Sequence, residues 1–154
     1  MGGTGVGAHE AAEQWIKEVF LPKEHGQTFK SRKLRLQSRG EANFHAVAAD
    51  GEVVAMICTN RAYALSGKVD KDALLKVQSD ALKILWLETT PAKRLIVCTD
   101  PDMVRVIREE KRKSHFPKEI EVVRAKLPKS IEELLEAERI KAPPNAIPDE
   151  DLEN

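Results

Sequence analysis

The sequence lacks an excess of either charge, has few cysteines and contains no long hydrophobic run. Lysine plus arginine equals aspartate plus glutamate at 25 each, so net charge argues neither for nor against a nucleic-acid partner. The two cysteines, Cys58 and Cys98, lie in apolar strand-like runs, and no secretory segment opens the chain. We therefore expect a reduced, cytoplasmic compartment. No apolar stretch approaches the roughly 20 residues of a membrane span, so we expect no membrane partner.

The length of 154 residues suits one domain with a core of its own. A glycine-rich start predicts a flexible leader over residues 1–8. The periodic part of the chain predicts a single domain over residues 9–141. Pro143 and Pro144 then stop the last helix, and a disordered acidic tail is expected over residues 142–154.

Hydrophobic periodicity predicts helices and strands in a mixed order. The first helix is expected to end at Pro22 and Gly26, and Trp15 and Trp86 fit helix-core positions. An antiparallel meander followed by a right-handed crossover to a parallel strand predicts a three-layer α/β domain, with helices on both faces of a central mixed sheet. The expected helices cover residues 9–21, 70–89, 101–114 and 130–140, and the expected strands cover 28–37, 42–49, 52–59, 93–99 and 120–127.

A hairpin at residues 42–59 is the most informative segment. Asp50-Gly51 is a strong type I′ turn signal and fixes the register of the two strands. In that register His45 lies opposite Met56, and Met56 and Cys58 are expected to share a face with His45. Opposed side chains have Cβ atoms about 4.5–5.5 Å apart. Two carboxylates so placed could hold a divalent cation, and a lysine two residues on could contact a scissile phosphate.

This hairpin, with this order of elements, resembles the PD-(D/E)XK nuclease superfamily. The family has an aspartate on the second strand and an acidic-x-lysine triplet on the third. The apolar-Asp-apolar-apolar run of the family corresponds here to Phe44-His45-Ala46-Val47. Its apolar-apolar-Glu-apolar-Lys-Thr run corresponds to Val54-Ala55-Met56-Ile57-Cys58-Thr59. The resemblance covers roughly residues 9–100 and implies a restriction-endonuclease-like fold.

All three signature residues of the family are replaced here. His45 could still ligate a metal, but Met56 is a soft, weak donor for a hard cation and Cys58 cannot replace the charge of lysine. The resemblance therefore implies a degenerate, catalytically inactive site without metal or cofactor. Glu13 and Gln78 stand where some relatives add a ligand or a polar side chain from a helix. A thiol nucleophile at Cys58 lacks an orienting third group, and a zinc site from His45, Cys58, Cys98 and His115 lacks paired spacing.

Basic residues gather in two segments that could form phosphate-facing surfaces. A charge run is also typical of the solvated face of a helix or strand, and that interpretation stays open. The nucleic-acid-binding candidates are Lys30, Arg32, Lys33 and Arg35 in the first segment and Arg105, Arg108, Lys111, Arg112 and Lys113 in the second.

Three functional hypotheses follow. The first is a catalytically inactive nuclease-like domain that binds nucleic acid or a protein partner through its basic surfaces. The second is a structural or protein-interaction module, with a homodimer as one form. The third is a residual metal-dependent nuclease with a relocated site at Glu13, His45 and Asp50.

Overall fold

Five strands form one open mixed sheet at the centre of the protein, and the computed structural model describes the chain from residue 7 to residue 141. The sheet order is β1-β2-β3-β4-β5, with β1–β2 and β2–β3 antiparallel and β3–β4 and β4–β5 parallel. The predicted meander and parallel crossover are therefore confirmed. The strands are β1 (Phe29–Arg35), β2 (Glu41–Ala48), β3 (Val53–Cys58), β4 (Lys93–Cys98) and β5 (Glu121–Arg124).

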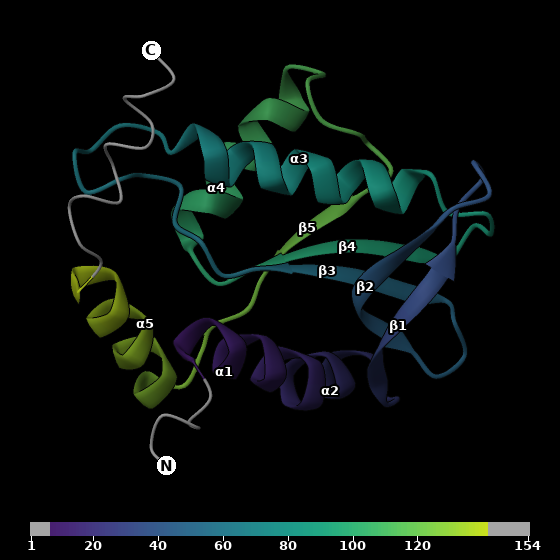
Figure 1. Ribbon diagram of the computed structural model, residues 1–154, viewed down its shortest axis with the longest axis horizontal. Helices are drawn as coiled ribbons and strands as arrows, with labels where there is room; N and C mark the ends of the chain where they lie inside the picture. The colour runs from purple at the N-terminus through teal and green to yellow at the C-terminus, as the bar shows by residue number, and fades with distance from the viewer. Residues whose placement is uncertain (1–6, 142–154) are drawn as a thin grey trace.

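Helices cover both faces of the sheet, as predicted (Figure 1). On one face α3 (Lys71–Leu85) and α4 (Pro101–Arg112) pack on a buried cluster that includes Phe44, Met56 and Ile96. On the other face the N-terminal helices and α5 (Lys129–Lys141) pack on a second cluster that includes Ala55, Ile57 and Val97. Alternation along the central strands produces these two cores, because successive side chains point to opposite faces.

The N-terminal helix continues through Pro22, which corrects the prediction that Pro22 ends it. It comprises α1 (Ala8–Trp15), a π-helical turn η2 (Ile16–Phe20) and α2 (Leu21–His25). Proline lacks an N–H and presses on the carbonyl four residues earlier. The wider π-helical turn directly before Pro22 accommodates it, and the N–H of Leu21 bonds to the carbonyl of Ile16 five residues back. The helix ends only at Gly26, which has a φ of 70°.

Helix α3 ends at Leu85, four residues before the predicted end. Leu87 instead forms an antiparallel bridge with Leu36, and the N–H of Gln37 donates to the carbonyl of Trp86. Trp86 is 52% exposed, so its predicted core position is wrong. The helix stops because the backbone that follows it is used to pair with the end of β1.

The predicted hairpin register is confirmed, since Ala46 pairs with Ala55 and Val47 with Val54. The predicted type I′ turn is wrong, because it needs a positive φ at both Asp50 and Gly51 and only Gly51 has one, at 77°. The chain turns instead at Ala49-Asp50, where the N–H of Gly51 donates to the carbonyl of Ala48.

The observed strands are shorter than predicted by one or two residues at most ends, and β5 stops at Arg124, three residues early. Residues 1–6 of the predicted leader and the predicted tail over 142–154 lie outside the described residues. Ala8, the last residue of the predicted leader, is buried at the start of α1.

None of the helices between residues 7 and 141 is long and apolar enough to cross a membrane.

Candidate functional site

The predicted site lies where β2 and β3 separate. Pairing between the two strands covers Ala46–Ala55 and Val47–Val54, while the rest of β3 pairs with β4 and the start of β2 pairs with β1. The β1–β2 register shifts between Lys30 and Arg32, so His45 and Ala46 together face Ser31. Such an irregularity bends the strand and redirects its side chains.

His45 fills the opening between the two strands. Its Nδ1 accepts a hydrogen bond of 2.7 Å from the backbone N–H of Ile57, and its Nε2 lies 4.0 Å from a carboxylate oxygen of Glu13 on α1. Burial lowers the pKa of His45 below its usual 6.5, against the opposing effect of Glu13. Neutral His45 therefore supplies the hydrogen-bond acceptor for the Ile57 N–H, at a point where β2 no longer pairs with β3.

Met56 and Cys58 share one face, as predicted, but His45 does not join them. Both residues are buried in the core beneath α3 and α4. The imidazole of His45 turns toward the β3 backbone and toward Glu13, on the helix that covers the opposite face. The expected three-residue face is wrong because the register shift at His45 redirects its side chain. Met56 is 2% exposed and has no access to a ligand.

A cleft lies beside this opening, at the carboxyl end of β3, with a volume of about 260 Å³. Cys58 contributes to its floor, and Glu13 and Asp80 supply acidic groups from α1 and α3. We call it the α1–α3 cleft. Its lining residues are His9, Glu13, Ile57, Cys58, Thr59, Asn60, Lys76, Val77 and Asp80.

Asp80 is a charged residue of this cleft that the sequence analysis missed. It is only 5% exposed, and two lysines flank its carboxylate: Lys76 Nζ at 3.5 Å and Lys83 Nζ at 3.8 Å. The sequence did hold a signal, because the spacings of four and three residues place all three side chains on one helix face. The paired charges leave Asp80 as a neutralised group and not as a free metal ligand.

The other expected ligands do not assemble around a metal. Gln78 is half-buried on α3 but does not line the cleft. Asp50 lies in the turn at the far end of the hairpin, where it accepts the N–H of Glu52. His115 lies beyond α4 and faces Glu110 at 3.5 Å. Between residues 7 and 141 no group of three or more His, Cys, Asp or Glu side chains is placed to hold a metal ion.

The two cysteines are strand neighbours, which was not anticipated. Cys58 and Cys98 are register partners on β3 and β4, and both are buried and reduced. The thiol of Cys98 hydrogen-bonds to Cys58, which lowers the pKa of Cys58. The same hydrogen bond, with burial, raises the pKa of Cys98. Of the two cysteines, Cys58 lines the α1–α3 cleft and Cys98 does not.

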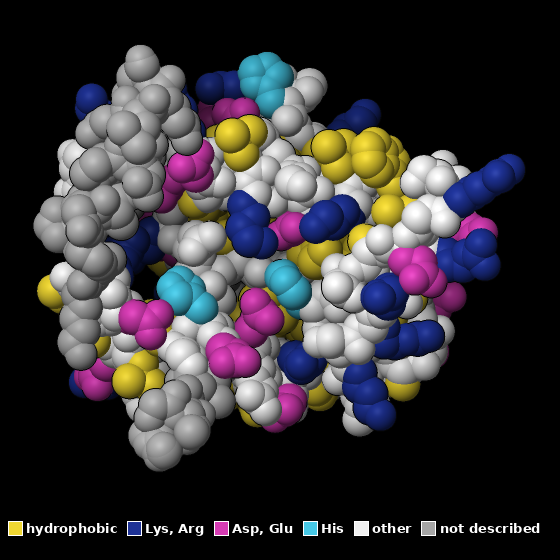
Figure 2. All heavy atoms as spheres, in the orientation of Figure 1, with side chains coloured by type: hydrophobic (Ala, Val, Ile, Leu, Met, Phe, Trp, Pro, Cys, Tyr) yellow, Lys and Arg dark blue, Asp and Glu magenta, His cyan; other side chains and the backbone are white. Residues whose placement is uncertain are grey.

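The first set of nucleic-acid candidates lies on an open edge of the sheet. Strand β1 is an edge strand, and Lys30, Arg32, Lys33 and Arg35 on it are all exposed. Among the described residues none of these four takes part in an ion pair. Figure 2 shows lysine and arginine side chains gathered over β1. On the same face, histidine and acidic side chains lie nearer the centre of the view.

The second set of candidates lies elsewhere and is largely engaged. Helix α4 packs beside β4 and β5, at the sheet edge opposite β1. Arg105 and Arg112 pair with Asp102 and Glu109 of the same helix. Arg108 and Lys111 donate hydrogen bonds to the backbone carbonyls of Val122 and Ile120. The two basic segments therefore form no single surface, and Lys113 follows the end of α4 as an exposed residue.

No protein-family model, curated protein or solved structure matches this chain. The candidate site combines an open basic edge strand with a neighbouring cleft in which Asp80 is already paired with two lysines.

Proposed function

We propose that this chain is a catalytically inactive member of the restriction-endonuclease-like fold that binds nucleic acid through β1 and the adjoining α1–α3 cleft. The order of helix, three antiparallel strands, helix and parallel strand supports the fold assignment. The position of the cleft supports it further, because the cleft opens where the second and third strands separate.

The chemistry of the cleft supports an inactive site. Met56 is sealed in the core and Cys58 occupies the position of the family lysine, so neither the second acidic ligand nor the cationic group is present. Glu13 is the nearest carboxylate to His45, and Asp80 is flanked by two lysines. A hard divalent cation prefers several oxygen ligands, and this arrangement offers one unpaired carboxylate.

The single observation that carries the binding proposal is the exposed basic edge strand. From Lys30 to Arg35 the strand extends about 17 Å at roughly 3.3 Å per residue. That length matches about five base-pair steps of a duplex. Alternate side chains of an edge strand point above and below it, yet all remain accessible from the open edge. Four phosphate contacts would give a log–log salt slope of about −3.6 on duplex DNA.

The test is a matched pair of charge reversals measured by fluorescence anisotropy with a labelled DNA duplex. Arg32→Glu with Lys33→Glu reverses two charges on β1, and Arg105→Glu with Arg112→Glu makes the same formal change on α4. We expect the β1 variant to lose at least tenfold in affinity and to show a shallower salt slope. The α4 variant should bind within about twofold of the unmodified protein, because its arginines are paired locally.

Three outcomes would overturn the proposal. Equal losses in both variants would indicate a diffuse charge effect, and cleavage of the duplex with Mg²⁺ or Mn²⁺ would indicate a residual nuclease. No binding, with a dimer detected by light scattering, would favour a protein-interaction module. That second candidate has a specific observation in its favour, since Leu75 and Leu82 on α3 and Trp86 directly after it expose apolar side chains.

A further inference from the structure

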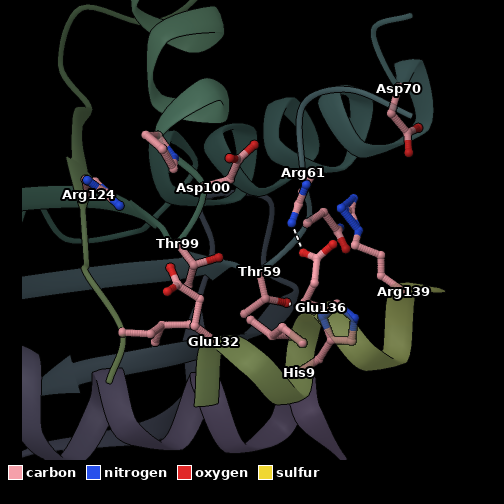
Figure 3. A pocket seen from close by; sticks show the side chains of 14 residues that line it. His9, Thr59, Arg61, Asp70, Thr99, Asp100, Arg124, Glu132, Glu136 and Arg139 are labelled. Atoms are coloured by element: carbon pink, nitrogen blue, oxygen red, sulfur yellow. Dashed lines mark hydrogen bonds and ion pairs between the residues drawn. The ribbon is translucent and has the colours of Figure 1, made fainter. Parts of the chain in front are cut away.

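A second hollow lies at the carboxyl ends of the three parallel strands. Thr59 follows β3, Thr99 follows β4, and Arg124 ends β5, while α5 runs along the opposite wall (Figure 3). The volume is about 430 Å³, within the roughly 300–1,000 Å³ of small-molecule sites. Open parallel sheets commonly bind ligands outside the carboxyl ends of their strands. We call this hollow the strand-end pocket.

Most carboxylates around the pocket already have partners. Asp100 accepts three backbone N–H groups, from Ala62, Asp102 and Met103. Asp70 caps α3 by accepting the N–H of Ala73. These two groups are therefore committed to helix ends, where the positive end of the helix dipole offsets their charge.

The arginines of the pocket are less well compensated. Glu136 on α5 pairs with Arg61, and Figure 3 shows Arg139 beside this pair. Among the described residues no carboxylate lies within ion-pair distance of Arg139 or Arg124. Burial and the adjacent guanidinium of Arg61 lower the pKa of Arg139. Of these two neighbouring guanidinium groups only Arg61 has a carboxylate partner, and such an arrangement favours an additional anion beside Arg139.

One further carboxylate, Glu132 at the start of α5, and several neutral groups complete the lining of the pocket. The hydroxyl of Thr59 lies 2.7 Å from Nδ1 of His9, and Thr99 lies on the floor at the end of the adjacent strand. Leu127 and Leu135 form an apolar part of the wall. Guanidinium groups match phosphate oxygens with paired hydrogen bonds, and hydroxyl donors suit an anion with several acceptor oxygens.

We propose that the strand-end pocket binds a small organic phosphate, with its phosphate group between Arg61 and Arg139 and its organic part along Leu127 and Leu135. The pocket shares His9, Thr59 and Asn60 with the α1–α3 cleft, but Arg61 and Arg139 line the pocket alone, and none of its lining residues lies on β1. The inference therefore rests on these two arginines and not on the proposed binding of nucleic acid through β1. A phosphate monoester with an apolar substituent should bind more tightly than inorganic phosphate, because only the ester reaches the leucines.

The test measures thermal unfolding of the full chain in inorganic phosphate and in phenyl phosphate, each against sodium chloride at equal ionic strength. We expect both anions to raise the Tm beyond chloride, with phenyl phosphate effective at a lower concentration. Arg139→Gln should weaken the apparent affinity at least tenfold. Arg112→Gln is the matched control, since Arg112 lies on α4 outside the pocket, and it should respond as the unmodified protein does.

A second measurement keeps the proposal testable if Arg139→Gln does not fold. Backbone amide chemical shifts of the unmodified protein should change at Arg61, Thr99 and Arg139, which line the strand-end pocket and not the α1–α3 cleft, when phenyl phosphate is added. Equal stabilisation of the Arg139→Gln and Arg112→Gln variants would overturn the proposal. So would the absence of any effect beyond chloride, or shift changes confined to residues outside the pocket.

Discussion

His45 is the residue at which the sheet opens, and its role here is structural. Its imidazole accepts a hydrogen bond from the Ile57 N–H, in the place of a backbone carbonyl of a paired strand. Burial favours the neutral form of the ring. Protonation would remove that acceptor and place a charge in a half-buried position. An unpaired buried backbone N–H costs about 1–3 kcal/mol.

The pH dependence of stability follows from the lowered pKa of His45. Below about pH 6.5 the unfolded chain takes up this proton more readily than the folded protein, so stability falls as pH falls. We expect the free energy of unfolding, measured in urea, to decrease between pH 7.5 and pH 5.0. In the His45→Gln variant, whose side chain cannot titrate, the free energy of unfolding should decrease less over the same pH range.

The control for this measurement is His115→Gln, because His115 is exposed beyond α4. It should retain the full pH dependence of the unmodified protein. An identical pH profile in the His45→Gln variant would show that His45 does not contribute.

At the scale of elements, Asp100 fixes how α4 meets the sheet. It is the N-cap of α4 and accepts the N–H groups of Asp102 and Met103, while Pro101 takes the first helical position. Its third bond, to Ala62, ties the loop after β3 to the same helix start. One side chain thus joins β4, α4 and the connection after β3.

We expect Asp100→Ala to lower the free energy of unfolding by about 2–3 kcal/mol, because three N–H groups lose their acceptor. Asp70→Ala removes a cap with one such bond at α3 and should cost about 1 kcal/mol. Urea denaturation of both variants, with Asp100→Asn as a conservative control, measures the difference. Equal losses at Asp70 and Asp100 would contradict a joining role for Asp100.

Much of the element order was predictable, because strong local signals coincide with it. The hairpin signal at Asp50-Gly51 and the helix start at Asp100-Pro101 each act within a few residues, and the hairpin register and the helix start were both predicted correctly. The features that were missed depend on contacts distant in sequence. Trp86 is exposed because Leu87 pairs with Leu36, which periodicity along the helix does not reveal.

The candidate site was only partly predictable for the same reason. The hairpin register correctly placed Met56 and Cys58 on one face of the sheet. The direction of the His45 side chain, however, depends on how β2 pairs with β1. The pairing of Cys58 with Cys98 depends on which strand joins β3. The strand-end pocket needs α5 to approach β3, although the two are about 70 residues apart in the sequence.

At the scale of the whole molecule, charge is distributed unevenly although the net charge is zero. The exposed basic strand β1 lies at one end of the protein, and α5, with Glu132, Glu133, Glu136 and Glu138, lies at the other (Figure 1). Basic residues on an edge strand also discourage pairing with the edge of another sheet. The uneven distribution would orient an approaching polyanion toward β1.

The most direct test of nucleic-acid binding through β1 is backbone amide chemical-shift mapping of the full chain on addition of a short DNA duplex at low salt. We expect the largest changes within residues 29–35 and around the α1–α3 cleft, and small changes in residues 101–112. Changes concentrated in residues 101–112, or no changes at all, would contradict the proposed role of β1.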